Sequence, residues 1–322
     1  MTSVPSVIDG VQPRLANQPR EKFVYLALTA SAFFWGAGFS VSRFALRTVS
    51  PLELLAGASV FGAATQIAWT AIRGNWRALR LPPSRIWPMV AFGLLSQNIL
   101  NGLTNLGLTS TTATNAALIY GFSPVIIGLL AAVFLRESYG NWKRLGAIVG
   151  FAGVALIITQ GHPEAIQLRG VMVGNLWILA GALYWAGYSV ATRSLTQRIP
   201  PEAYTFYIIV LGAVLPVAWV WAKENRFCLA GVDRPTLVAM AFLGTCTATA
   251  AMNFWNWGLA RIEASRVGMF CYLEPVFAAA IALIFLGERF TWPTAIGSVL
   301  VFAGIFFSTG KWRRSRGTEI GS

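Results

Sequence analysis

One carboxylate interrupts an otherwise apolar run, VGMFCYLEPVFAAAIALIFLG, at residues 267–287. Glu274 follows Arg266 by eight residues, so a helix rising about 1.5 Å per residue would carry it near the middle of a membrane. An ionisable group at that depth is costly to insert and therefore faces a cavity or a partner. Two interpretations stay open: a proton-responsive or cation-recognising group at a central cavity, or a protonated acid that bonds a neighbouring helix.

A proline follows this glutamate, and the run GFSPVI at 121–126 repeats the pattern without the acid. Pro124 and Pro275 each remove a backbone donor and free the carbonyl four residues earlier, at Tyr120 and Cys271. Both prolines predict helix kinks, and interrupted helices at equivalent points of two halves mark the substrate sites of many transporters. We therefore expect Tyr120 at a binding site. A passive kink, which membrane helices tolerate, is the alternative.

Polar residues also recur on one face of two apolar segments. They are Asn98, Asn101 and Asn105 on the first, and Thr245, Thr249, Asn253 and Asn256 on the second. Side chains three, four or seven residues apart share a face of a helix. Such stripes either line a wet path across the membrane or bond neighbouring helices to each other.

Aromatic residues lie inside two further apolar segments, FFWGAGFSVSR at 33–43 and LYWAGYSVATR at 183–193. Trp35 and Phe39 in the first have counterparts in Trp185 and Tyr188 in the second. Rings placed this deep can stack on a planar or apolar group of a substrate. Ordinary packing between helices is the alternative for each of them.

The elements that position these residues follow from composition. The chain has 322 residues, of which 56% are hydrophobic and 11% charged, less than half of the roughly 25% charged residues usual in soluble domains. Apolar stretches of about 20 residues recur along it, each long enough to cross a bilayer as a helix. The sequence predicts an all-α membrane protein with ten transmembrane helices, at residues 23–45, 52–72, 86–106, 112–135, 142–160, 171–192, 203–222, 236–257, 265–286 and 292–310.

Lysine and arginine are distributed unevenly between these helices. Segments between successive spans lie alternately on the two sides of the membrane. Of the 25 basic residues, 18 lie on the side that holds both chain ends and 7 on the other side. Basic residues collect on the cytoplasmic side, so both termini are expected in the cytoplasm. The net charge of +13 is then explained by topology, and no nucleic-acid partner is expected.

The chain also repeats itself. Residues 107–153 align without a gap to 258–304 at a constant offset of 151, which pairs Gly107 with Gly258, Pro124 with Pro275 and Glu137 with Glu288. Each half has an odd number of spans, so the second half enters the membrane from the opposite side, as in many secondary transporters. We expect a disordered cytoplasmic tail at 1–22, five-helix repeats at 23–160 and 171–310, and a basic cytoplasmic tail at 311–322.

Two five-span halves, each with a PVF or PVI element, a phenylalanine–leucine pair and a glutamate, resemble the drug/metabolite transporter superfamily, specifically its EamA-type ten-span members. The resemblance covers roughly residues 23–310. It implies a permease of the bacterial inner membrane, often an exporter of amino acids or other small metabolites.

The predicted function is a secondary transporter that exports amino acids or related zwitterions by alternating access, without cofactor or metal. The alternatives are a drug or organic-cation efflux protein of the same fold, and a non-transporting scaffold or an intramembrane enzyme. Few histidines, cysteines or paired acids lie within the spans, which argues against catalysis. Expected partners are a small-molecule substrate, the lipid bilayer and, if transport is coupled to proton exchange, protons. No sequence feature specifies the solute, its direction, the energy coupling or an oligomeric state.

Overall fold

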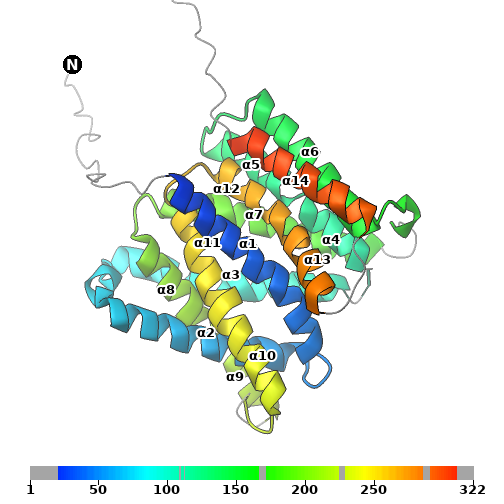
Figure 1. Cartoon of the computed structure of the whole chain (residues 1–322). Coiled ribbons are helices and arrows are strands. Elements are labelled where there is room, and N and C mark those ends of the chain that lie inside the picture. Colours follow the sequence, from blue (N-terminus) through cyan, green and yellow to red (C-terminus); the bar gives the residue numbers. More distant parts are fainter. Residues whose placement is uncertain are drawn as a thin grey trace, which may run out of the picture.

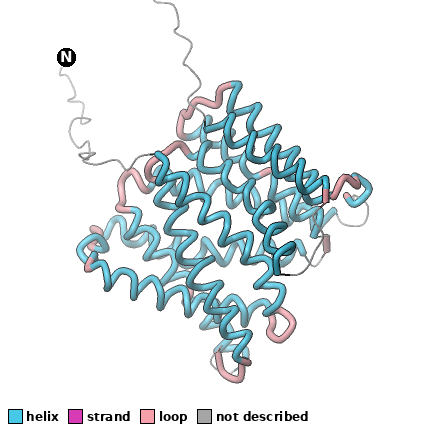
Figure 2. The backbone as a smooth tube through the Cα atoms, viewed as in Figure 1, coloured by secondary structure: helices cyan, strands magenta, loops and turns pink. Residues whose placement is uncertain are grey.

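The computed structural model describes residues 21–108, 110–111, 113–166, 172–224, 229–285 and 291–309. Every regular element within these ranges is a helix, and Figure 2 shows no strand among them. The expected tails lie outside this part of the chain, except for Glu21 and Lys22, which already belong to the first helix.

Helical segments occur at all ten expected positions, with ends that agree within three residues. The first half contains α1 (Glu21–Ala45), α2 (Pro51–Arg73), η1 (Asn75–Leu79), α3 (Pro83–Leu108), α4 (Ala113–Gly121), α5 (Ser123–Phe134), α6 (Asn141–Thr159) and η2 (Pro163–Ala165). The second half contains α7 (Met172–Leu195), α8 (Pro201–Gly212), α9 (Val214–Glu224), α10 (Arg234–Phe242), η3 (Leu243–Ala250), α11 (Ala251–Leu259), α12 (Ala264–Gly268), η4 (Met269–Tyr272), α13 (Leu273–Phe285) and α14 (Trp292–Thr309).

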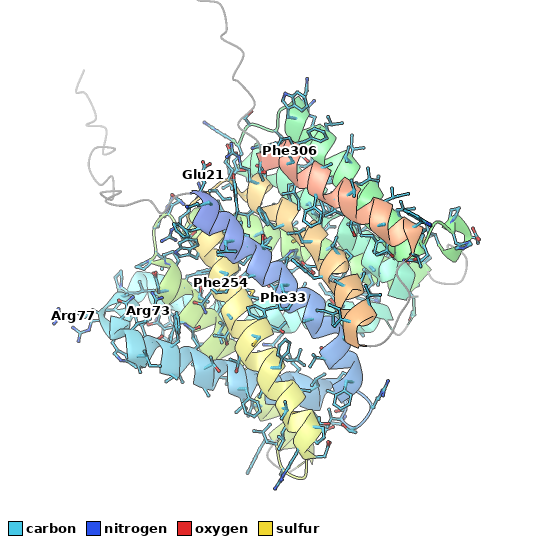
Figure 3. The ribbon with its side chains drawn as sticks, in the orientation of Figure 1. Glu21, Phe33, Arg73, Arg77, Phe254 and Phe306 are labelled. Carbon is cyan, nitrogen blue, oxygen red and sulfur yellow. The ribbon has the colours of Figure 1, made fainter. Side chains whose placement is uncertain are left out.

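Eight of these segments are long and apolar enough to cross a membrane, two fewer than the sequence prediction. The other two, α3 and α7, are helical but fall short of that apolarity; α3 carries Asn98, Asn101 and Asn105, and α7 carries Asn175 and Arg193. Large apolar side chains are exposed on the outer faces, for example Ile72 at 82% and Phe306 at 60%, and Figure 3 shows Phe306 on α14. An apolar outer surface of this extent is suited to lipid, so the protein is a multi-pass membrane protein.

Local sequence explains where the helices begin and end. Before α2, Ser50 accepts a hydrogen bond from the Glu53 N–H at 3.3 Å, and the Glu53 carboxylate accepts one from the Ser50 N–H at 2.8 Å. This reciprocal pair satisfies two backbone donors that a helix start would leave unpaired. At the other end of α2, Gly74 takes φ +62°, which costs glycine little. The chain is thereby turned sharply at both ends of α2.

Helices of the two halves are interleaved. Figure 1 shows α1 between α11 and α13, and the same three helices are in contact. In the same way α7 contacts α3 and α5, and α2 lies against η3 while α3 lies against α8. The main core contains the fully buried Trp255 and Tyr272 from the second half, and Leu28 and Ile127 from the first. Neither half therefore has a separate hydrophobic core.

The closest helix pair is α6 and α14, which run antiparallel with glycines at the crossing (Figure 1). A Cβ atom on Gly146 would lie 2.5 Å from the carbonyl oxygen of Gly304, and one on Gly153 would lie 2.5 Å from that of Gly297. Small residues of this kind let two backbones approach closely in a membrane.

We expect Gly153→Ala to lower the free energy of unfolding by about 2 kcal/mol, because the new methyl group meets backbone that cannot move aside. Thermal unfolding in detergent micelles measures the change. Gly187→Ala in α7 is the matched control, since nothing lies within 4 Å of its Cβ position and alanine favours the helix. Equal melting temperatures for the two variants would contradict the prediction.

Candidate functional site

The spans that contain Pro124 and Pro275 are each interrupted directly before that proline. The fourth span divides at Phe122, whose N–H donates to the Ile119 carbonyl at 3.1 Å, and α5 starts anew with Pro124 in its first turn. The ninth span changes from α12 through the 3₁₀ segment η4 into α13, with Pro275 in the first turn. The structure therefore places Tyr120 and Glu274 at the two interruptions.

Glu274 lies in the first turn of α13, where this helix crosses α1. The crossing is close, since a Cβ atom on Gly36 would lie 2.7 Å from the Glu274 carbonyl oxygen, and the Phe33 and Phe277 rings meet at 5.5 Å. The Glu274 side chain is half-buried. Such a carboxyl group is placed between spans of both halves rather than at the surface.

Tyr120 approaches the same region from the first half. Its hydroxyl lies 2.5 Å from the Thr104 hydroxyl and covers Gly181 of α7. The Tyr120 phenol is close enough to Glu274 for an electrostatic interaction. The two interrupted spans thus bring a phenol and a carboxyl group into one region.

An aromatic cluster adjoins Glu274. The ring of Trp35 contacts those of Trp185 at 5.5 Å and Trp255 at 5.2 Å, and Trp185 and Trp255 are 5.4 Å apart. Tyr188 stacks on Trp185 at 5.4 Å. Trp35 directly precedes Gly36, whose Cβ position lies 2.7 Å from the Glu274 carbonyl oxygen, so the cluster is next to the crossing of α1 and α13. Trp35, Trp185 and Tyr188 were expected from the sequence, whereas Trp255 was not, and its one sequence signal is its place between Asn253 and Asn256.

The described asparagines of the two polar stripes bond neighbouring helices. Asn98 donates to the carbonyls of Leu94 at 2.6 Å and Gly212 at 3.3 Å. Asn253 donates to the side chain of Gln66 at 2.7 Å, and Asn256 to the hydroxyl of Thr205 at 3.0 Å. The side chains of Phe39, Asn101 and Asn105 lie outside the part that the structure describes. Contact of any of these residues with substrate stays a prediction.

The threonines of the second stripe lie on η3, a π-helix within the eighth span. Thr245 bonds the Thr65 hydroxyl at 2.9 Å, and Thr249 donates to the Gly62 carbonyl at 3.0 Å, so both face α2. The Thr247 carbonyl accepts a hydrogen bond from the Trp35 indole at 3.2 Å. π-Helical turns inside α-helices are frequent at functional sites. This one is bonded directly to the aromatic cluster.

We expect Trp35→Phe to lower the free energy of unfolding by about 1 kcal/mol, because the Thr247 carbonyl loses its donor while most of the ring contact remains. Denaturant unfolding in mixed micelles measures this. Trp219→Phe is the control, since Trp219 is 64% exposed on the outer surface. The predicted role of Trp35 fails if the two variants unfold alike.

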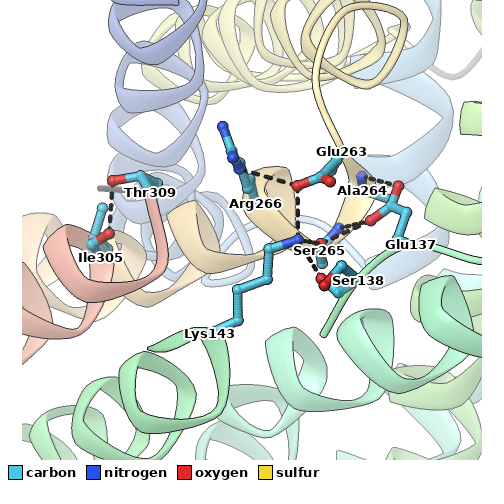
Figure 4. Close-up of polar contacts among 9 residues, drawn as sticks. All are labelled: Glu137, Ser138, Lys143, Glu263, Ala264, Ser265, Arg266, Ile305 and Thr309. Carbon is cyan, nitrogen blue, oxygen red and sulfur yellow. Dashed lines mark hydrogen bonds and ion pairs between the residues drawn. The ribbon is translucent and has the colours of Figure 1, made fainter. Parts of the chain in front are cut away.

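A second polar cluster joins two loops, one from each half (Figure 4). We call it the loop clasp; its residues are Glu137, Ser138, Lys143, Glu263, Ser265 and Arg266. The Glu137 carboxylate accepts the N–H of Ala264 at 2.7 Å, and the N–H and hydroxyl of Ser265 at 3.0 and 2.7 Å. Glu137 thereby caps the start of α12 from the other half of the chain.

Lys143 completes the clasp from α6. Its ammonium group donates to the Ser138 carbonyl and the Glu263 carboxylate, both at 2.7 Å, and to the Ser265 hydroxyl at 2.9 Å. Arg266 pairs with Glu263 at 3.0 Å. From the sequence, Glu137 was notable only as the repeat partner of Glu288, and nothing in its spacing from Ala264 indicated contact.

Comparison with known proteins finds one family model that matches the chain twice, at residues 22–159 and 172–310, described as the EamA-like transporter family. Among curated proteins, the "Uncharacterized transporter YyaM" of Bacillus subtilis is 28% identical over 89% of this chain and 93% of its own length. The "Probable terminal-alkyne amino-acid exporter" of Streptantibioticus cattleyicolor is 27% identical over 87% of this chain and 91% of its own.

One further curated protein and one solved structure are also similar to this chain. The "S-adenosylmethionine/S-adenosylhomocysteine transporter" of Chlamydia muridarum is 27% identical over 86% of this chain and 88% of its own length. A crystal structure with 22% identity superposes with a TM-score of 0.77 and covers 89% of this chain and 96% of its own. At that identity the structural similarity concerns the fold.

Proposed function

The chain belongs to the EamA-like transporter family, and on this premise we propose that it is a secondary transporter that exports a small zwitterionic metabolite, such as an amino acid, by alternating access. The observation that carries the proposal is the position of the tryptophan cluster, Tyr120 and Glu274 beside interrupted helices, where helices of both halves pack on one core. Sites of secondary transporters lie at such interfaces between halves, beside interrupted helices. The similarity to a protein named as an amino-acid exporter supports the substrate class.

We further propose ten spans arranged as two inverted five-helix repeats, at 23–160 and 171–310, with both termini in the cytoplasm of a bacterial inner membrane. Supporting this, contacts occur in equivalent pairs: α1 with α11 and α7 with α3, and likewise α1 with α13 and α7 with α5. In the antiparallel crossing of α6 and α14, Gly146 meets Gly304 and Gly153 meets Gly297, and the repeat offset of 151 exchanges these two contacts. Equivalent spans run in opposite directions in an inverted repeat.

In this orientation the loop clasp lies on the cytoplasmic side, because residues 136–144 and 261–266 belong to the arginine- and lysine-rich breaks. Its bonds join the two halves there, and we propose that they hold the transporter closed toward the cytoplasm. Release of substrate outside is followed, in the proposed cycle, by breakage of these bonds and rocking of the halves.

Flux into and out of proteoliposomes tests the proposal. A panel of amino acids, organic cations and nucleosides is assayed with and without a pH gradient, against protein-free liposomes. We expect saturable amino-acid flux. A profile restricted to organic cations would favour the efflux alternative, and no saturable flux of any solute would overturn the transporter proposal. Amino-acid flux that survives Glu274→Gln with its pH dependence unchanged would exclude proton coupling through this residue while retaining the transporter.

A further inference from the structure

The end of α2 and the turn that follows it carry an exposed cluster of arginine and tryptophan. We propose that this cluster binds an anionic phospholipid, whose phosphate contacts Arg73, Arg77 and Arg80 while an acyl chain lies along α2. We call the cluster the arginine corner; its residues are Trp69, Ile72, Arg73, Trp76, Arg77 and Arg80. The inference goes beyond transport, and the proposed orientation places the corner at the cytoplasmic leaflet.

The arginines of the corner have no protein partner for their charge. Arg73, Arg77 and Arg80 are exposed, and none forms an ion pair or donates a side-chain hydrogen bond to a residue that the structure describes. Figure 3 shows Arg77 at the outer edge of the molecule, beyond the end of α2. Basic residues that are expected on the same side and have protein acceptors are Lys143, Arg144, Arg193, Arg261 and Arg266. The corner therefore holds three positive charges within residues 73–80 that an external anion can neutralise.

The short helix η1, which carries Arg77, is bonded to α8 of the second half. The Tyr207 hydroxyl donates to the Leu79 carbonyl at 2.9 Å, and the ring centres of Trp76 and Phe206 lie 6.2 Å apart. Leu79 also packs against a buried cluster formed mainly by α8. The arginines are thus presented from a fixed backbone, and a preorganised site loses less entropy when it binds.

An apolar surface adjoins the arginines on α2. Trp69 and Ile72 are three residues apart and share a helix face, and both are exposed, Ile72 at 82%. The guanidinium carbon of Arg73 lies 4.6 Å from the centre of the Trp69 ring, a cation–π contact that holds the charge beside this face. Trp76 is exposed in η1, and tryptophans favour the level of the lipid headgroups. Apolar face and positive charge are therefore adjacent, as a lipid that binds through both chain and headgroup requires.

The charge of the corner selects among headgroups. A guanidinium group binds phosphate through paired hydrogen bonds. Phosphatidylcholine also carries a trimethylammonium group, which three arginines repel, and residues 69–80 include no carboxylate to attract it. Phosphatidylglycerol has the same phosphate without a cation. We therefore expect the corner to prefer phosphatidylglycerol, because attraction to anionic lipid grows with each basic residue near the membrane surface.

Native mass spectrometry of the purified full chain tests this preference. It counts the lipids bound when phosphatidylglycerol or phosphatidylcholine with the same acyl chains is added. We expect phosphatidylglycerol to bind on the order of tenfold more tightly. The triple variant Arg73→Gln/Arg77→Gln/Arg80→Gln should lose the preference. Lysine at the same three positions should retain part of it, because the charge remains without the paired hydrogen bonds.

A second triple variant separates the corner from the total charge of the protein. Arg313→Gln/Arg314→Gln/Arg316→Gln removes the same charge from the basic segment after α14. It should prefer phosphatidylglycerol as strongly as the parent protein does. Equal losses of preference in the two triple variants would show attraction by net charge alone and would overturn the inference.

A fluorescence measurement locates the bound lipid. In a chain without other cysteines, a thiol introduced by Ile72→Cys carries a bimane fluorophore, and phosphatidylglycerol with brominated acyl chains quenches it in phosphatidylcholine nanodiscs. Phe306→Cys is the control, since Phe306 is 60% exposed near the end of α14, on the same side in the proposed orientation. We expect severalfold stronger quenching at residue 72 than at residue 306, and the glutamine triple variant of the corner should remove this excess.

Equal quenching at the two positions would mean that the lipid has no preferred place on the protein, and the inference would be overturned. Neither assay measures flux, so this result would leave the proposed transport activity standing.

Discussion

Lys143→Met is expected to lower the free energy of unfolding by about 3 kcal/mol, because the Glu263 carboxylate loses the nearer of its two cationic partners. The Lys143 side chain is 11% exposed and that of Glu263 is 36% exposed, so solvent moderates the loss on one side of the pair. The carbonyl of Ser138 and the hydroxyl of Ser265 lose a donor as well. Denaturant unfolding in micelles measures the change.

The neighbouring Arg144 gives a matched control. Its guanidinium bonds the Tyr139 carbonyl at 3.0 Å in an exposed position, so Arg144→Met should cost well under 1 kcal/mol. The double variant Lys143→Met/Glu263→Gln measures the coupling of the pair, and its loss should be smaller than the sum of the two single losses. Equal losses of unfolding free energy for Lys143→Met and Arg144→Met would show that the loop clasp does not stabilise the protein.

Glu137→Ala is expected to lower the free energy of unfolding by about 2–3 kcal/mol, because three donors of Ala264 and Ser265 lose one charged acceptor. Glu137→Gln keeps the shape of the side chain but presents one acceptor oxygen, so its loss should be smaller. Glu164→Ala, which removes an exposed carboxylate 72% open to solvent, should leave stability unchanged.

Glu137→Ala is also expected to make residue 264 more accessible to solvent. The side chain of Ala264 is fully buried behind the clasp. In a chain without other cysteines, a thiol introduced by Ala264→Cys should react slowly in inside-out vesicles, and severalfold faster when Glu137→Ala is added. Unchanged reactivity would mean that Glu137 does not hold this side of the protein closed.

The sequence predicted the helices well, because about 20 consecutive apolar residues between polar breaks leave little else that a membrane permits. It also predicted helix interruptions at Pro124 and Pro275, where the structure has them, since proline acts on its own backbone. The internal repeat marked Trp35 and Trp185 as counterparts, and the structure brings their rings to 5.5 Å, a contact that the repeat did not predict.

Other contacts in the structure had no signal in the local sequence. The bond from Glu137 to Ala264 joins residues 127 apart, and it depends on how two loops meet after the helices have packed. Trp255 enters the aromatic cluster through the orientation of α11, which periodicity alone does not define. The prediction of ten spans is neither confirmed nor contradicted, because α3 and α7 are helical but less apolar than the other eight segments. Asn98 of α3 and Asn175 of α7 form hydrogen bonds with neighbouring segments.

The eighth span holds about one residue more than an α-helix of its height would contain, since Leu243–Ala250 is wound as a π-helix between α10 and α11. Rewinding that stretch to the α-helical register would turn one end of the span against the other by about 100° and shift it by about 1.5 Å. The Thr247 carbonyl would then leave Trp35, and Asn253 would leave Gln66. The π-helix therefore permits a rotation and shift of this size within one continuous helical span, next to the tryptophans.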